Sequence, residues 1–96
     1  MEKDKVVRRL HRQIDRASRR IDDLKLQTHL AKADAKAAFV ERVESLEKKR
    51  NDLRDSIHHL QYNTTSAWED LAEGCKKSWT ELKTSLRNAI AEYRSE

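Results

Sequence analysis

The conformation of THLAKADAKAAF, residues 28–39, decides between two helical architectures for this chain of 96 residues. The part from Ala31 to Ala38 holds five alanines and contains neither glycine nor proline. Alanine has the highest intrinsic helix propensity, so this part predicts one helix that continues through the whole segment. We therefore expect a long helix over about residues 4–62. A turn near residues 30–34 is the alternative, and it would produce three helices of similar length.

Two runs of apolar positions flank this segment, and both step by three and four residues, which is typical of a heptad seam. The first run comprises Val7, Leu10, Ile14, Ala17, Ile21, Leu24, Thr28, Ala31, Ala35 and Ala38. The second run, one residue out of phase with the first, comprises Phe39, Val43, Leu46, Arg50, Leu53, Ile57, Leu60 and Thr64. Local unwinding absorbs such a phase shift without ending a helix.

QYNTTS, residues 61–66, is the clearest interruption of the helical pattern. Asn, Thr and Ser compete for backbone hydrogen bonds and weaken a helix interior. Ser66 precedes Glu69 by three residues, which is the spacing of a capping box. We expect a short break at about 63–65 and a final helix over about 66–95, although an uninterrupted helix is the alternative.

The final helix repeats its large apolar residues at intervals of eleven. Eleven residues complete three turns at about 3.67 residues per turn, which is close to a straight α-helix. One apolar stripe is therefore expected from Trp68, Leu71, Cys75, Trp79, Leu82, Leu86, Ile90 and Tyr93. One border of this stripe is basic, with Lys76, Lys83, Arg87 and Arg94.

The composition favours narrow seams over a large core, because charged residues are 40% of the chain and aromatic residues only 5%. The long helix would measure about 88 Å and the final helix about 45 Å. Folded back as an antiparallel hairpin, the final helix would leave the seam from Val7 to Leu30 uncovered, and uncovered seams associate. We therefore expect an all-α fold. It would be a single helical domain over residues 1–96, a coiled-coil hairpin that forms a homo-oligomer, most readily a dimer. A three-helix bundle is the alternative.

The net charge of +4 is concentrated near the amino terminus, where residues 1–20 carry eight Lys/Arg and three Asp/Glu. Steps of three and four residues align Arg9, Arg12, Arg16 and Arg19 on one face away from the seam. Such a face suits phosphates or anionic lipid, or acidic residues of a protein partner. Interleaved aromatic residues are missing, so we do not expect base stacking.

No constellation of residues predicts catalysis, a metal site or a cofactor. Gly74 is the single glycine, so a glycine-rich phosphate loop is excluded. The four histidines have no i, i+4 partner among themselves or with Cys75. Cys75 is the only cysteine and lies in the apolar stripe, so we expect it to pack rather than react. We therefore expect a non-enzymatic protein without cofactors. We also expect it to be cytoplasmic, because neither a membrane span nor a secretory leader is recognisable.

The residues that we expect to mediate helix packing and interaction are apolar members of the first part of the long helix and of the final helix. They are Val7, Leu10, Ile14, Ile21, Leu24, Trp68, Leu71, Trp79, Leu82, Leu86 and Ile90. For the two tryptophans, insertion into a membrane surface is the alternative, since basic residues border their stripe as in interfacial amphipathic helices.

The segment KADAKAAF at 32–39 and the tail resemble small bacterial proteins, notably cyanobacterial ones, described as stress-response or coiled-coil proteins. The tail residues that carry this resemblance are Ala67, Trp68, Leu71, Gly74, Trp79, Leu82 and Ala89. Ser78 stands where that family commonly has alanine before the second tryptophan. The resemblance covers about residues 22–93 and implies a cytosolic, helical, non-catalytic protein associated with stress.

The sequence thus predicts a non-enzymatic structural or protein-interaction protein, linked to stress, that acts through oligomerisation and charged helical faces. The alternative is peripheral binding to anionic membrane surfaces or nucleic acid. That alternative would use the basic amino-terminal helix and the tryptophan-bearing carboxy-terminal helix.

Overall fold

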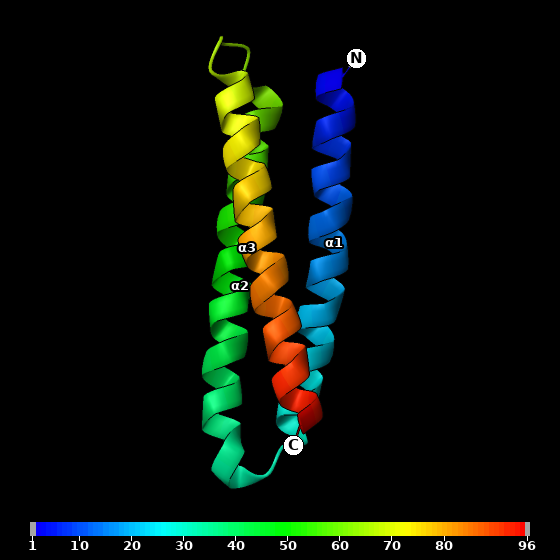
Figure 1. Cartoon of the computed structure of the whole chain (residues 1–96), viewed down its shortest axis with the longest axis vertical. Coiled ribbons are helices and arrows are strands. Elements are labelled where there is room, and N and C mark those ends of the chain that lie inside the picture. The colour runs from blue at the N-terminus through cyan, green and yellow to red at the C-terminus, as the bar shows by residue number, and fades with distance from the viewer. Residues whose placement is uncertain (1, 96) are drawn as a thin grey trace.

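The computed structural model describes residues 2–95 and folds them into three helices. Helix α1 spans Glu2–His29, α2 spans Ala33–Tyr62 and α3 spans Trp68–Ser95. The chain reverses direction at each connection, so α1 and α3 run parallel and α2 runs antiparallel to both (Figure 1). The bundle is a rod of 50 × 17 × 16 Å, about one helix long. The expected all-α fold is confirmed, and the three-helix alternative fits it.

The expected long helix over residues 4–62 is wrong, because α1 ends at His29 and α2 begins at Ala33. The last turn of α1 tightens, since the N–H of Leu30 donates to the carbonyl of Gln27 at 3.0 Å. Lys32 then adopts an extended backbone, with φ −63° and ψ 148°. No described non-glycine residue has positive φ, so this connection requires neither glycine nor proline.

Burial explains why alanine propensity did not keep the helix continuous. Propensity differences among ordinary residues are about 0.7 kcal/mol per residue at most. The turn lets α2 and α3 cover α1, where Leu10, Ile14 and Ile21 are at most 3% exposed. Burying each such side chain is worth about 1.5–3 kcal/mol. Covering the same seam with a second chain would cost about 4–15 kcal/mol of lost freedom, whereas a short turn within one chain avoids that cost.

The second connection spans residues 63–67, so α3 begins two residues later than expected. The Asn63 side-chain oxygen accepts hydrogen bonds from the backbone N–H and the hydroxyl of Thr65, at 2.9 and 2.8 Å. The Thr65 hydroxyl oxygen in turn accepts from the N–H of Ala67 at 3.2 Å. Asn63 and Thr65 therefore organise the turn in place of the expected capping box at Ser66.

The core follows the predicted heptads in the first two helices. The buried residues of these seams are Leu10, Ile14, Ala17, Ile21, Leu24, Thr28, Phe39, Val43, Leu46, Leu53, Ile57 and Leu60. The last expected member of each run is exposed: Ala38 lies inside α2, and Thr64 lies in the second connection. Arg50, at a seam position of α2, is half-buried and turns its guanidinium to the Asn51 side chain.

The seam of α3 differs from the expected eleven-residue stripe. Its buried and half-buried members are Trp68, Ala72, Cys75, Trp79, Leu82, Leu86, Ala89 and Tyr93. Those positions step by four and three residues, so α3 also follows a heptad. Ala72 is 4% exposed, whereas Leu71, expected in the stripe, is 39% exposed. A helix that supercoils around two neighbours keeps a period of about 3.5, and this period selects Ala72 over Leu71.

Tyr93 fixes α3 to the other two helices at the end of the bundle near residues 30–32. Its ring stacks on Phe39 of α2 with centroids 4.1 Å apart. Its hydroxyl lies 2.5 Å from Oγ1 of Thr28 in α1. The Thr28 hydroxyl also contacts the carbonyl of Leu24 at 2.8 Å, and the Tyr93 hydroxyl lies 3.4 Å from the carbonyl oxygen of Phe39.

Candidate anion-binding groove

Two of the three borders between helices are lined by complementary polar side chains. On both borders of α2, cations face an acid or a neutral acceptor. The pairs are Lys25 with Glu47 (3.7 Å), Arg54 with Ser18 (3.5 Å), Arg42 with Glu92 (2.8 Å) and Lys49 with Ser85 (2.9 Å). Such exposed pairs contribute about 0–1 kcal/mol each, so they add little to the stability of the bundle.

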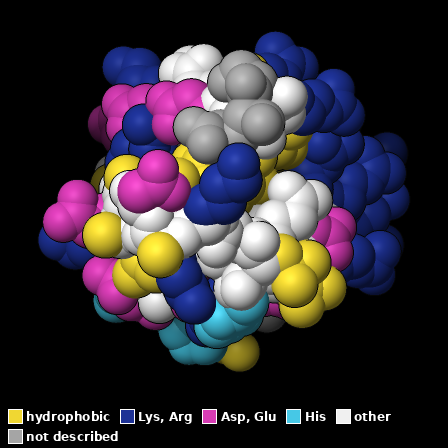
Figure 2. Space-filling model, turned by 90° about the horizontal axis from the view of Figure 1, so that it is seen from below, with side chains coloured by type: hydrophobic (Ala, Val, Ile, Leu, Met, Phe, Trp, Pro, Cys, Tyr) yellow, Lys and Arg dark blue, Asp and Glu magenta, His cyan; other side chains and the backbone are white. Residues whose placement is uncertain are grey.

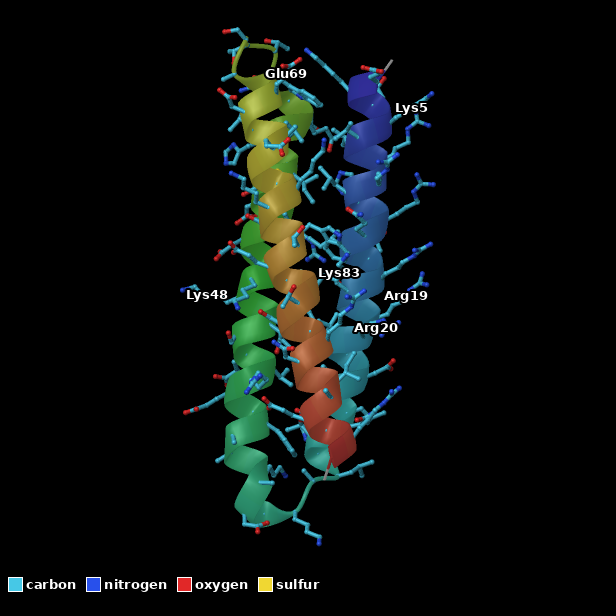
Figure 3. The ribbon with its side chains drawn as sticks, in the orientation of Figure 1. Lys5, Arg19, Arg20, Lys48, Glu69 and Lys83 are labelled. Carbon is cyan, nitrogen blue, oxygen red and sulfur yellow. The ribbon has the colours of Figure 1, made fainter. Side chains whose placement is uncertain are left out.

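The border between α1 and α3 is different, because both helices present cations to it. We call this border the basic groove, and its cations are Arg16, Arg20, Lys83, Arg87 and Arg94. Figure 3 shows Arg20 on α1 and Lys83 on the neighbouring side of α3. Within the described part of the chain, none of these five cations lies within 4.0 Å of a carboxylate oxygen.

The floor of the basic groove is apolar. Ala17 and Leu86 are buried beneath it, at 1% and 4% exposure. Trp79 and Ile90 are half-buried and close it from the side of α3. The hollow bounded by Ala17, Trp79 and their neighbours has a volume of about 190 Å³. A small residue at position 17 keeps this space open.

The groove continues along the bundle towards the carboxyl end of α3. A second hollow, of about 570 Å³, shares Arg20, Arg87 and Ile90 with the first. Asp23 of α1 enters the lining beyond it, and it is the one carboxylate among the described groove residues. From Trp79 to Arg94, at 1.5 Å per residue, the groove extends about 22 Å.

Like charges that face each other across a border repel, and an anion placed between them relieves that repulsion. Figure 2, seen from the end that carries residues 30–32, shows Lys and Arg gathered along the α1 side of the rod. Asp and Glu lie mainly on the other side. Among its described lining residues the basic groove has five cations and one carboxylate, Asp23, so it is the border with the largest excess of positive charge.

The arginine face expected on α1 is only partly the face that the structure uses. Arg9, Arg12, Arg16 and Arg19 are all exposed, but Arg16 alone among them lines the basic groove. Arg19 points away from α3 in Figure 3, and Arg12, seven residues earlier, lies on the same side of α1. The groove takes its other cations from Arg20 and from the basic border predicted for the final helix.

Most residues expected to mediate helix packing lie in the core or against it. Leu10, Ile14, Ile21, Leu24, Trp68, Leu82 and Leu86 are buried. Val7, Trp79 and Ile90 are partly buried against them. Leu71 is the exception, since its exposure places it at the outside of α3.

The structure describes no constellation suited to catalysis at Cys75 or to metal binding. Cys75 is buried, and desolvation raises the pKa of its thiol, so it stays protonated and a poor nucleophile. Across residues 2–95, no cluster of three His, Cys, Asp or Glu side chains could hold a metal ion. In the same range, no helix combines the length and apolar character needed to cross a membrane.

Comparison with protein-family models, curated proteins and solved structures returned no match to this chain. The resemblance to small bacterial stress-response proteins therefore stays a prediction.

Proposed function

We propose that this protein is a non-enzymatic interaction module that binds an anionic partner in the basic groove. One observation carries the proposal: cations from two helices face each other across the α1–α3 border, and Asp23 is the single carboxylate among the described residues that line it. The borders of α2 are complementary in the same molecule, so an overall excess of lysine and arginine does not explain this arrangement. The resemblance to stress-response proteins suggests that this binding takes place in a stress response, and the proposed binding in the groove does not depend on that link.

Self-association stays a prediction, but its original reason does not hold in this fold. The seam of α1 was expected to need a second chain as its cover. Leu10, Ile14 and Ile21 of that seam are instead covered by α2 and α3 of the same chain. A single chain therefore suffices for the proposed binding module, and light scattering tests the expected dimer directly.

Binding to membranes or nucleic acid is the alternative, and the positions of the tryptophans count against the membrane version. Trp68 is 8% exposed, and its indole N–H donates to the carbonyl of Leu60. Trp79 lies in the floor of the groove, below the cations. Insertion of the Trp68 indole into lipid would require α3 to leave the bundle, at the cost of the core, and lipid could reach only the exposed edge of Trp79.

The proposal is tested with two variants that change the net charge equally. One variant combines Arg20→Glu with Arg87→Glu inside the groove, and its control combines Arg12→Glu with Arg19→Glu on the outer face of α1. Binding of fluorescently labelled poly-glutamate is measured by anisotropy, after circular dichroism has established that both variants are helical. The groove variant should lose about tenfold or more in affinity, because each charge-assisted contact is worth about 1.5–3 kcal/mol. The control should lose much less, and equal losses would refute a specific role of the groove.

A further inference from the structure

We infer that the basic groove takes an acidic amphipathic helix of a partner protein, which lies along α1 and α3 as a fourth helix of the bundle. This inference rests on the proposed function and specifies the chemistry of the partner. The groove combines an apolar floor with cationic rims. A single helix with one apolar edge and acidic flanks is able to contact both.

The shape of the groove suits a helix. Two neighbouring parallel helices leave a furrow between them, and a third helix packs into such a furrow at an interaxial distance of about 8–10 Å. The furrow here extends about 22 Å from Trp79 to Arg94, which corresponds to about 15 residues of helix, or four turns. Four turns supply enough side chains for an apolar edge and two charged flanks.

The floor argues for an apolar edge on the partner. Trp79 and Ile90 are half-buried along the floor of the groove, with the hollow above Ala17 beside them. An aromatic anchor inside a polar rim is the usual anatomy of an energetically dominant contact in a protein interface. A leucine or isoleucine of the partner would fill this hollow and cover the exposed edge of Trp79. A phosphate backbone or a lipid headgroup would instead place charge against these apolar groups.

The rims argue for acidic flanks on the partner. Arg16 and Arg20 on α1 are four residues apart, and so are Lys83 and Arg87 on α3. Side chains four residues apart on a helix lie one above the other, so each rim matches acidic residues at the same spacing on a helix laid beside it. This arrangement corresponds to the flanking charges that determine partner choice in coiled coils.

Asp23 makes the two ends of the groove different in charge. It stands on the α1 rim beyond Arg20, near Arg94 of α3. A basic residue of the partner would be favoured opposite Asp23, and an acidic residue would be favoured everywhere else along the rims. The partner helix is therefore expected to be acidic along both flanks and to carry one lysine or arginine near the end that lies at Asp23.

The test uses wild-type protein and two synthetic helical peptides of about 15 residues. The first peptide has leucines along one edge, glutamates on both flanks and one terminal lysine. The second has the same composition in an order that destroys the apolar edge but keeps the net charge. Affinities are measured by anisotropy of labelled peptide, and the emission of Trp79 is followed in a Trp68→Phe variant, where Trp79 is the single tryptophan.

The expected result is that the amphipathic peptide binds at least about tenfold more tightly than its rearranged control. Binding should shift the emission of Trp79 to the blue, because the peptide covers the indole. Ile90→Gln should weaken the amphipathic peptide and leave the control peptide unchanged. Arg20→Glu with Arg87→Glu should weaken both peptides, and Arg20→Gln with Arg87→Gln replaces that variant if charge reversal disrupts folding.

Two outcomes overturn the inference, and they are distinguishable. If both peptides, duplex DNA or phosphatidylserine vesicles bind equally well and all depend on Arg20 and Arg87, the acidic helix is refuted while anion binding by the groove stands. If no probe depends on Arg20 and Arg87, the inference and the proposed function fail together.

Discussion

The indole N–H of Trp68 donates a hydrogen bond to the carbonyl oxygen of Leu60 across the second connection, with nitrogen and oxygen 3.0 Å apart. Leu60 lies in the last turn of α2, where carbonyl groups lack partners within the helix. The Trp68 ring is only 8% exposed, and the Lys3 ammonium lies 5.3 Å from its centroid. One residue thus caps α2, closes the core at this end and attaches the start of α1.

Trp68→Phe is expected to destabilise the bundle only moderately. Phenylalanine keeps most of the apolar contact, and the Leu60 carbonyl still accepts from the N–H of Asn63 at 3.2 Å. Loss of one hydrogen bond should cost about 1 kcal/mol in the free energy of unfolding. Trp68→Ala should cost about 3–5 kcal/mol, because it also opens a cavity. Denaturant unfolding measures both values, and similar costs would mean that the ring does not support the core.

Leu71→Ala and Leu82→Ala form a matched pair that tests the heptad of α3. Leu82 is 1% exposed, so its truncation should cost about 2–5 kcal/mol. Leu71 is 39% exposed, and its truncation should cost about 1 kcal/mol or less. The same unfolding measurement compares them. Equal costs would restore the eleven-residue stripe and contradict the packing described above.

Tyr93→Phe is expected to lower the free energy of unfolding by about 1 kcal/mol. The substitution removes the hydroxyl that lies beside Thr28 but leaves the ring stacked on Phe39. Tyr62→Phe is the matched control, because Tyr62 is 69% exposed and its substitution should change little. The hydroxyl of Tyr93 would have no structural role if the two variants unfolded at the same denaturant concentration.

Cys75 is expected to make stability fall at alkaline pH. Burial raises the pKa of its thiol in the folded protein, so the folded state holds this proton more tightly than the unfolded state. The resulting stability is fully present below the unfolded thiol pKa of about 8.5 and is lost as pH rises through the folded pKa. Cys75→Ala lacks this contribution, so unfolding curves of the two proteins should diverge above about pH 8.5. Parallel pH profiles would contradict the assignment.

At the first connection, local helix propensity does not decide the structure. Ala31 to Ala38 has every local property of a helix interior, and most of it is helical in the structure. The chain nevertheless turns at residues 30–32, because a turn lets the seam of α1 pack within the same molecule. Helix propensity is a sum over residues that are adjacent in the sequence. The stabilisation from burying the α1 seam arises instead from contacts between residues tens of positions apart.

The basic groove was missed for a similar reason. The arginines of the first helix and the basic border of the last were both visible as separate features. Arg20 and Lys83 are 63 positions apart in the sequence, and they face the same groove only because α1 and α3 are parallel neighbours. The basic border of the final helix was visible in the sequence. The spacing of residues within that helix does not show which face of α1 this border will contact.

The amino-acid order alone accounts for three features: helical structure, the break after Tyr62 and the buried faces of the first two helices. The spacing of apolar residues along one helix is sufficient to predict its buried face. That face depends on a periodicity of 3.5 or 3.6 residues and not on residues far away in the sequence. Three other features required the packed bundle: the turn after His29, the burial of Ala72 in place of Leu71, and the groove. Each depends on which helices become neighbours. That choice is made by burial summed over the whole chain, which outweighs the propensity of any single segment.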